Sequence, residues 1–191
     1  EYTLVAIADY ILGHKKGPTV SNLSSTLALR DISRKHGVEY HAAAVGEVNV
    51  VNKMKEVSAV IGGEGNGGVI VPELHYGRDA LVGIALMLTH MAEQGKTLLE
   101  IKSELPYYEM TKSKIDLTKE TDVDGILRFV ENKFKDEDVT TIDGVKIIFD
   151  SEWVHLRKSN TEPIIRIYAE SSTKEKADKL VGMIRSTIES M

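Results

Sequence analysis

Apolar residues in the first half of the chain alternate between helical and strand-like spacing. Helical spacing recurs in four segments: 2–13, 25–36, 47–56 and 80–93. Short apolar stretches with the length of strands lie between them: 19–23, 40–45, 57–61 and 69–71. Asp79 precedes the last helix and is expected to cap it. Strands that alternate with helices predict a three-layer α/β/α domain.

The pattern changes at residues 105–108, where Pro106 opens a charged, irregular stretch that we interpret as a linker. Beyond it we expect one helix, three or four short strands and a final helix over residues 174–189. The strand-like runs are 139–142, 145–149, 153–157 and 164–170. Asp143-Gly144 joins the first two and is typical of a hairpin turn. The sequence thus predicts an α/β/α domain at 1–104 and a small α+β domain at 109–191.

Composition and charge narrow the classes of function. The chain has 191 residues, no cysteine and a formal net charge of −5. The lack of cysteine removes thiol catalysis and thiolate metal sites, and it fits a reducing compartment, so we expect a cytoplasmic protein. Negative charge gives no long-range attraction for nucleic acid, and no apolar run approaches the length of a membrane span. Nucleic acid and membrane are therefore not expected as partners, and any anion site must be local.

The N-terminus and the histidines add two further expectations. Glu1-Tyr2-Thr3-Leu4 lacks the basic start of a signal peptide and has the pattern of a helix interior, so a piece of a longer protein is expected. Five histidines match no metal-site spacing and are expected to be structural: His14, His36, His41, His90 and His155.

The segment Arg157-Lys158-Ser159-Asn160-Thr161-Glu162-Pro163, followed by Arg166, offers chemistry suited to phosphate. Phosphate binds planar guanidinium donors, hydroxyl groups and free backbone amides. Arg157 ends one expected strand and Arg166 lies early in the next, so both reach the same turn. Ser159 and Thr161 add hydroxyls there, and Asn160 tolerates backbone angles that turn amides outward. On this chemistry alone, a polar turn with two unrelated surface arginines fits the sequence equally well.

A second segment, residues 62–68, combines glycines with one carboxylate, Glu64, and one amide, Asn66. Its Gly-x-Gly-x-x-Gly spacing formally matches the fingerprint of a nucleotide-binding oxidoreductase. That fingerprint requires a helix at its last glycine, and Val69-Ile70-Val71-Pro72 is not a helix start, so we reject this function. A carboxylate among glycines suits a sugar better, because it accepts hydrogen bonds from two neighbouring hydroxyls. The alternative is that Glu64 only caps local amides.

The arginine-containing segment resembles the phosphate-binding loop of the α-D-phosphohexomutases, which include phosphomannomutases, phosphoglucomutases and phosphoglucosamine mutases. The shared motif is Arg-x-Ser-Asn-Thr-Glu-Pro-x-x-Arg. The resemblance implies that five residues hold the non-reacting phosphate of the substrate: Arg157, Ser159, Asn160, Thr161 and Arg166. It leaves Glu162 to support one of the arginines.

The glycine-rich segment resembles the sugar-binding Gly-Glu-x-Ser-Gly-His loop of the same family. It is similar to a branch that carries Gly-Glu-Gly-Asn-Gly-Gly and a downstream Gly-Arg-Asp, here residues 77–79. The resemblance implies that Glu64 and Asn66 bind sugar hydroxyls. Gly68 replaces the family histidine, and the family lysine is missing near Ala44. Arg78 and His75 are candidate sources of polarity nearby, and either is equally compatible with a solvated loop residue.

The resemblance covers the whole chain, as the third and fourth of four domains. It implies an isomerase that interconverts hexose 1-phosphate and hexose 6-phosphate through a phosphoserine and a bisphosphate intermediate. In the family the phosphoserine lies in the first domain, and Mg²⁺ is held by an aspartate loop in the second. Neither motif occurs here, and Asp122-Val123-Asp124 is expected to begin a helix instead.

Because the resemblance places the phosphoserine and the metal site in other domains, it limits what this chain can do by itself. No catalytic or metal-ligating residue is expected in it, and the isolated chain is expected to be inactive. The implied partners are hexose phosphates and the protein's own N-terminal domains. A stand-alone, non-catalytic sugar-phosphate-binding module is the alternative. The preferred hexose stays open, because a carboxylate that binds the 3- and 4-hydroxyls does not read the 2-position.

Overall fold

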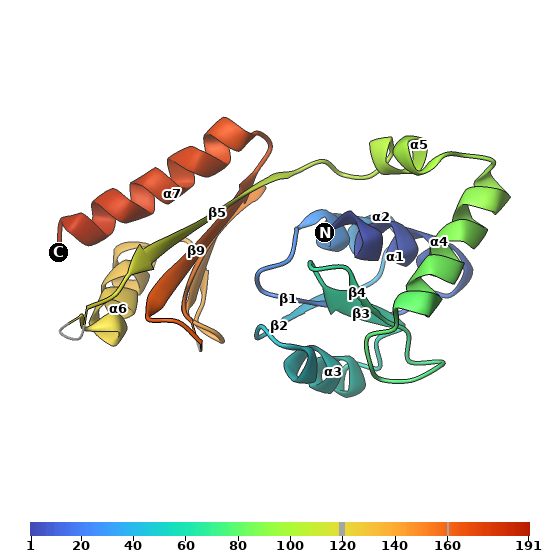
Figure 1. Cartoon of the computed structure of the whole chain (residues 1–191), viewed down its shortest axis with the longest axis horizontal. Coiled ribbons are helices and arrows are strands. Elements are labelled where there is room, and N and C mark those ends of the chain that lie inside the picture. The colour runs from blue at the N-terminus through green and yellow to red at the C-terminus, as the bar shows by residue number, and fades with distance from the viewer. Residues whose placement is uncertain (119–120, 160) are drawn as a thin grey trace. The chain divides into compact units, whose positions relative to one another are not determined.

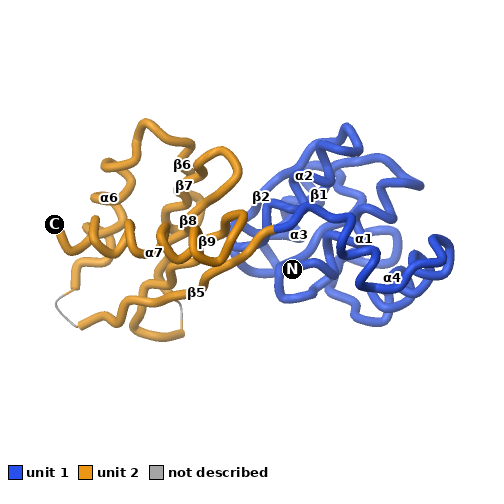
Figure 2. The backbone as a smooth tube through the Cα atoms, turned by 90° about the horizontal axis from the view of Figure 1, so that it is seen from above, with its two compact units in different colours: residues 1–107 blue, residues 108–191 orange. Residues whose placement is uncertain are grey.

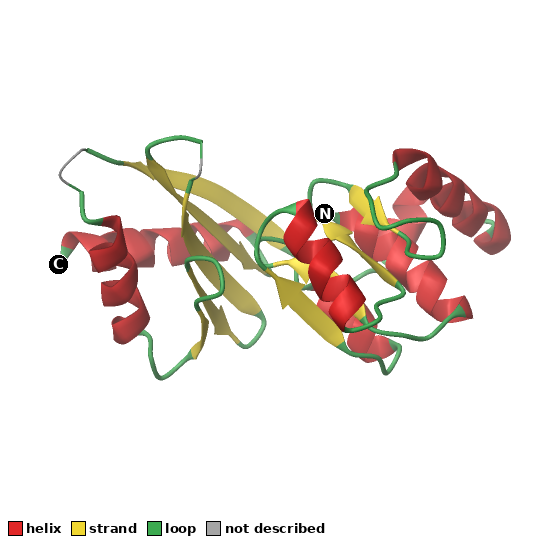
Figure 3. Cartoon of the chain, turned by 90° about the horizontal axis from the view of Figure 1, so that it is seen from below, coloured by secondary structure: helices red, strands yellow, loops and turns green. Residues whose placement is uncertain are grey.

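The computed structural model describes residues 1–118, 121–159 and 161–191. The chain forms two compact units, Glu1–Tyr107 and Tyr108–Met191, because most residue contacts fall within one unit or the other (Figure 2). Each unit has its own β-sheet with helices packed on it (Figure 3). None of the helices in the described parts of the chain is both long and apolar enough to cross a membrane.

The first unit is a three-layer α/β/α structure, as the sequence predicts. Its elements are α1 (Tyr2–His14), β1 (Thr19–Asn22), α2 (Ala28–Lys35), β2 (Tyr40–Ala43), α3 (Glu47–Glu56), β3 (Ile61–Glu64), β4 (Gly68–Ile70), α4 (Ala80–Gln94) and α5 (Leu98–Ser103). The strand order is β2-β1-β3-β4, with β1 parallel to both neighbours and β4 antiparallel to β3. Helices α1 and α2 lie on one side of the sheet and α3 on the other (Figure 1).

The central strand β1 is buried along its whole length, and its side chains alternate between the two helical layers. On the α3 side, Val20 and Ile70 of the sheet pack with Val50 and Met54 of the helix. The parallel strands β1, β2 and β3 end at the same edge of the sheet, which is where ligands bind in open α/β sheets. Polar residues stand at that edge, and Glu64 is one of them.

The glycine-rich segment differs from its prediction. The apolar run 57–61 was expected to form the strand, but residues 57–60 form the turn after α3 and the strand continues through Gly62 and Gly63. Close neighbours explain why glycines occupy strand positions. A Cβ at Gly62 would lie 2.9 Å from the carbonyl oxygen of Val20, and one at Gly63 would lie 1.9 Å from that of Gly68.

The second unit packs an antiparallel sheet against two helices. Its elements are β5 (Glu109–Asp116), α6 (Val123–Lys133), β6 (Asp138–Thr140), β7 (Val145–Phe149), β8 (Glu152–Lys158), β9 (Ile164–Ser171) and α7 (Lys174–Glu189), and the strand order is β5-β9-β8-β7-β6. The hairpin at Asp143-Gly144 is confirmed, because β6 pairs antiparallel with β7. The helix start at Asp122 is also confirmed, since its side chain accepts a hydrogen bond from Gly125 N. Strand β5 was not expected; its charged residues were interpreted as irregular.

The alternation of β8 and β9 places two arginines on the same face of the second sheet. Val154 and Leu156 of β8, and Ile165 and Ile167 of β9, belong to the hydrophobic core formed with α6 and α7. Successive side chains of a strand point to opposite faces. The residues that alternate with this core, Arg157 and Arg166, therefore lie on the face away from the helices, where they are register partners.

Candidate functional site

Glu64 is the last residue of β3, and the residue is only 6% exposed. Its Oε1 accepts a hydrogen bond of 2.8 Å from Nδ2 of Asn22 and one of 3.3 Å from the backbone N of Gly46. Its Oε2 lies 3.8 Å from Nη1 of Arg78 and accepts no hydrogen bond from the described residues. The carboxylate is thus fixed through one oxygen, and the other has unused capacity to accept hydrogen bonds.

Asn66 lies at the tip of the hairpin between β3 and β4 and is exposed. Its Oδ1 accepts a 3.0 Å hydrogen bond from the backbone N of Gly68. That bond holds the turn and leaves the side-chain NH₂ free to donate. Asn66 therefore has a structural role in the hairpin and still offers donors to a ligand.

A cavity of about 590 Å³ opens beside this hairpin, within the usual size range of ligand sites. Its lining residues are Glu47, Asn66, Gly67, Gly68, Val69, Arg78, Asp79 and Ala80. Arg78 lines the cavity and also lies beside Glu64, so it connects the open space with the fixed carboxylate.

The two candidate sources of polarity, Arg78 and His75, have different surroundings. Arg78 donates to Glu47 from its backbone N (3.0 Å) and from Nε (2.8 Å), and these bonds lower the pKa of the Glu47 carboxyl. His75 contacts Asp79, 3.0 Å away, and this contact lowers the pKa of that carboxyl. Asp79 caps α4 by accepting from the backbone N of Leu81, as the sequence predicts. Arg78 faces the cavity, whereas His75 supports the start of a helix.

Two residues of this site were missed in the sequence. Asn22 ends β1 and bonds Glu64 of the hairpin, whereas Glu47 begins α3, bonds Arg78 and lines the cavity. The signal for Asn22 was its place at the carboxyl end of a strand-like apolar run. For Glu47 no local signal exists. An acidic residue in the first turn of a helix is common, because its negative charge interacts favourably with the helix dipole.

In the second unit, the ends of β8 and β9 hold the predicted phosphate-binding residues. Arg157 and Arg166 are directly paired across the two strands. Ser159 is 6% exposed, and its backbone N donates to the carbonyl oxygen of Ile164, which closes the turn. Its Oγ lies 3.4 Å from the backbone N of Thr161 and 3.5 Å from Nη2 of Arg166. The predicted residue Asn160 lies outside the described residues.

Arg157 and Arg166 differ in the hydrogen-bond partners of their guanidinium groups. Arg166 pairs with Glu162, which matches the supporting role expected for that carboxylate. The Nε of Arg157 is buried and has no hydrogen-bond partner among the residues that the structure describes. A buried donor without an acceptor is costly, so the guanidinium group of Arg157 is not fully satisfied by the described residues.

His155 lies on the same strand as Arg157 and is almost completely buried. Its Nε2 donates to the carbonyl oxygen of Asp143 at 2.6 Å. Burial lowers the pKa of His155 to about 4, so the ring is neutral at pH 7. The positive charge near this turn therefore comes from arginine and lysine side chains and not from an imidazolium.

Among the described residues there is no group of three or more histidine, aspartate or glutamate side chains placed to hold a metal ion.

Comparison with known proteins identifies both units. The model of the phosphoglucomutase/phosphomannomutase α/β/α domain III matches residues 1–108, and that of the phosphoglucomutase/phosphomannomutase C-terminal domain matches residues 107–187. The chain belongs to the phosphoglucomutase/phosphomannomutase family. Within it, the chain corresponds to the third and C-terminal domains, which confirms the resemblance seen in the two motifs.

Relatives in this family cover the chain almost completely. It is 37% identical over 179 residues to a phosphoglucomutase/phosphomannomutase of Thermococcus kodakarensis, a match that spans 92% of this chain and 39% of the relative. It is 34% identical to a phosphoglucosamine/phosphogalactosamine mutase of Sulfurisphaera tokodaii over 89% of this chain and 38% of the relative. The chain thus spans about two fifths of the length of these relatives.

Solved structures of the family share the fold. A phosphoglucomutase/phosphomannomutase family protein of Burkholderia thailandensis superposes with a TM-score of 0.82 at 24% identity, over 98% of this chain and 41% of that one. The phosphoglucomutase parafusin of Paramecium gives a TM-score of 0.79 at 16% identity over 98% of this chain. At such identities the match establishes the architecture of the two domains.

Proposed function

We propose that this chain is the substrate-binding C-terminal portion of a mutase that interconverts hexose 1-phosphate and hexose 6-phosphate. The phosphoserine that carries the phosphoryl group, and Mg²⁺, would belong to N-terminal domains outside this chain. The phosphoserine would donate the phosphoryl group, and Mg²⁺ would neutralise the charge that develops during its transfer. We further propose that the protein works in the cytoplasm.

The observation that carries this proposal is the arrangement of Arg157 and Arg166 on paired positions of β8 and β9. Guanidinium groups on adjacent strands, beside the hydroxyl of Ser159, present several donors to one point in space. Arg157 is half-buried and its Nε lacks an acceptor among the described residues, so this guanidinium group is not fully committed to contacts within the chain. We assign this site to the non-reacting phosphate of the substrate, with Thr161 and Asn160 as further donors.

We assign the other end of the substrate to the hairpin of the first unit. Glu64 Oε2 would accept hydrogen bonds from sugar hydroxyls, and the amide of Asn66 would donate to one. Binding energy from these remote contacts holds the reacting phosphoryl group in place, which is how enzymes convert binding into rate. No proton transfer is assigned to this chain.

The phosphate site is tested by titrating inorganic phosphate or a hexose phosphate into the isotope-labelled chain and following backbone amides by NMR. We expect the largest shifts at Ser159–Glu162, with a dissociation constant of about 1 mM or somewhat below and weaker binding at higher salt. Arg157→Ala and Arg166→Ala should largely abolish the shifts.

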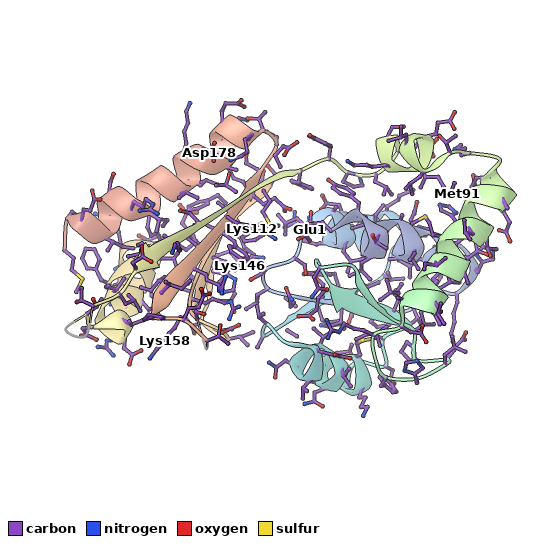
Figure 4. All side chains as sticks on the ribbon, in the orientation of Figure 1. Glu1, Met91, Lys112, Lys146, Lys158 and Asp178 are labelled. Carbon is purple, nitrogen blue, oxygen red and sulfur yellow. The ribbon has the colours of Figure 1, made fainter. Side chains whose placement is uncertain are left out.

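Lys158→Ala is the matched control, since it removes a cation from the same segment. Lys158 (labelled in Figure 4) is exposed, and it alternates with Arg157 along β8, so its side chain leaves the strand on the other face. This variant should reduce the shifts only slightly. If the largest shifts fall at residues 62–68 instead, the sugar and phosphate roles are reversed. A full-length protein that binds hexose phosphates but never interconverts them would favour the non-catalytic binding module.

A further inference from the structure

Arg78 occupies the space in which a side chain at position 68 would lie. A Cβ added to Gly68 would come within 2.4 Å of Cδ and 3.0 Å of Cγ of Arg78. Gly68 is an ordinary strand residue, so its backbone angles do not require glycine. The requirement comes from the arginine that crosses over it.

Glu47 holds Arg78 in this position through both of its carboxylate oxygens. Oε1 accepts from the backbone N of Arg78 at 3.0 Å, and Oε2 accepts from Nε at 2.8 Å. Two bonds from one carboxylate to the backbone and side chain of the same residue fix where the guanidinium group points. Because Glu47 begins α3 directly after Gly46, the same helix start contacts both Arg78 and Glu64.

The remaining donors of Arg78 face the cavity. Its side chain is 46% exposed, and it is the one cationic side chain that lines this cavity among the described residues. Nη1 is 3.8 Å from Oε2 of Glu64, which is too long for a hydrogen bond. One oxygen atom about 2.8 Å from each of these two atoms would see them at an angle of about 85°, so a single hydroxyl can contact both.

We propose, on the basis of the mutase function above, that Arg78 binds the substrate and that Glu47 is its positioning residue. Nη1 of Arg78 donates a hydrogen bond to the same sugar hydroxyl whose proton is donated to Oε2 of Glu64. A hydroxyl is suited to this place because it donates and accepts at once. A deoxy position offers neither bond.

The test is a double-mutant-type cycle in the full-length enzyme, in which removal of the Arg78 side chain is combined with removal of a hydroxyl from the substrate. kcat/KM is measured for a hexose phosphate and for its 3-deoxy and 4-deoxy analogues, in the wild type and in Arg78→Ala. We expect the wild type to lose about 100-fold or more on one analogue, because a site built to bind a hydroxyl is left with unpaired groups. Arg78→Ala should lose about 10-fold or more on the normal substrate, and its penalty for that analogue should shrink by about the same factor.

Two further variants test the positions of Glu47 and Gly68. Glu47→Ala should reproduce the Arg78→Ala pattern, and the double variant should be no worse than Arg78→Ala alone. Gly68→Ala should displace Arg78 and give the same pattern. Glu56→Ala is the matched control, because it breaks the 2.8 Å pair with Lys53 on the same helix and should leave kcat/KM unchanged.

The outcomes separate this inference from the function on which it rests. A wild-type enzyme without mutase activity would overturn the proposed function and this inference together. An active wild type whose full deoxy penalty persists in Arg78→Ala would overturn only the assignment of Arg78. Additive losses in the Glu47 and Arg78 double variant would overturn the positioning role. In every variant, the backbone amide signals of the first-unit core should keep their wild-type positions, which shows that the mutated unit still folds, and the phosphate-induced shifts at Ser159–Glu162 should persist in the second unit.

Discussion

The side-chain amide of Asn22 donates a 2.8 Å hydrogen bond to Oε1 of Glu64. Both side chains are nearly buried, and they stand at the carboxyl ends of the neighbouring parallel strands β1 and β3. A carboxylate that is already bonded through one oxygen has little freedom to rotate, so its other oxygen stays directed toward Arg78. Such preorganisation would lower the entropic cost of the sugar binding that we propose at this carboxylate.

Glu64→Ala in the full-length enzyme should lower kcat/KM by about 100-fold, or about 3 kcal/mol, because a charged acceptor for sugar hydroxyls is lost. Asn66→Ala should cost about 10-fold, since bonds from a neutral amide are weaker. Steady-state kinetics with circular dichroism as a folding check measures both. Wild-type kcat/KM in Glu64→Ala would remove this residue from the site.

The 191-residue chain alone should show no mutase activity, because the phosphoryl donor and the metal are proposed to lie outside it. The measurement is a coupled assay for conversion of glucose 1-phosphate to glucose 6-phosphate in the presence of Mg²⁺. Phosphate binding seen by NMR in the same preparation serves as the control for folding. Any turnover that depends on Mg²⁺ would contradict this expectation.

The second unit should lose stability as pH falls from about 6.5 toward 4, because His155 is held neutral there. Its folded-state pKa of about 4 lies below the unfolded value of 6.5. The unfolded chain therefore binds a proton in this range while the folded chain does not, and acid favours unfolding by up to about 3 kcal/mol. Groups facing the ring include Lys146, Asp143 and Arg157.

Urea unfolding followed by tryptophan fluorescence isolates this effect, because the single tryptophan, Trp153, lies in the second unit. His155→Gln keeps a side-chain donor for the Asp143 carbonyl and has no titrating ring. In this variant the unfolding free energy should depend less steeply on pH between 4.5 and 7. Its slope should be about half of the wild-type slope or less. An unchanged slope would assign the pH dependence to other groups.

Gly144→Ala should destabilise the second unit by about 2 kcal/mol or more. Gly144 has φ of +75°, and a Cβ there would lie 2.1 Å from the carbonyl oxygen of Leu156, so both backbone angle and space require glycine. Gly182→Ala is the matched control, because this helical glycine has nothing within 4 Å of a new Cβ. It should stabilise α7 by about 0.5–1 kcal/mol. Equal midpoints for the two variants in urea would contradict the prediction.

Several features needed tertiary structure before they could be seen. From Thr111 to Asp116, strand β5 alternates uncharged and charged residues, and its lysines suit a sheet edge, but its strand conformation comes from pairing with β9. The apolar run 57–61 has the composition of a strand, yet Ser58 adopts a φ of +53° and the strand begins only at Ile61. Propensity is a weak guide where neighbouring segments decide the backbone.

The sequence by itself determined the features whose causes are local. These features depend on residues close together in the chain. They are the helical spacing of apolar residues, the caps at Asp79 and Asp122, the hairpin at Asp143-Gly144 and the segment 157–166. The tertiary structure alone decided the bond from Asn22 to Glu64 and the hold of Glu47 on Arg78, across 42 and 31 positions. Such contacts depend on the order of the strands in the sheet and on where a helix begins beside the sheet edge. Neither feature produces a periodic pattern of apolar and polar residues in the sequence.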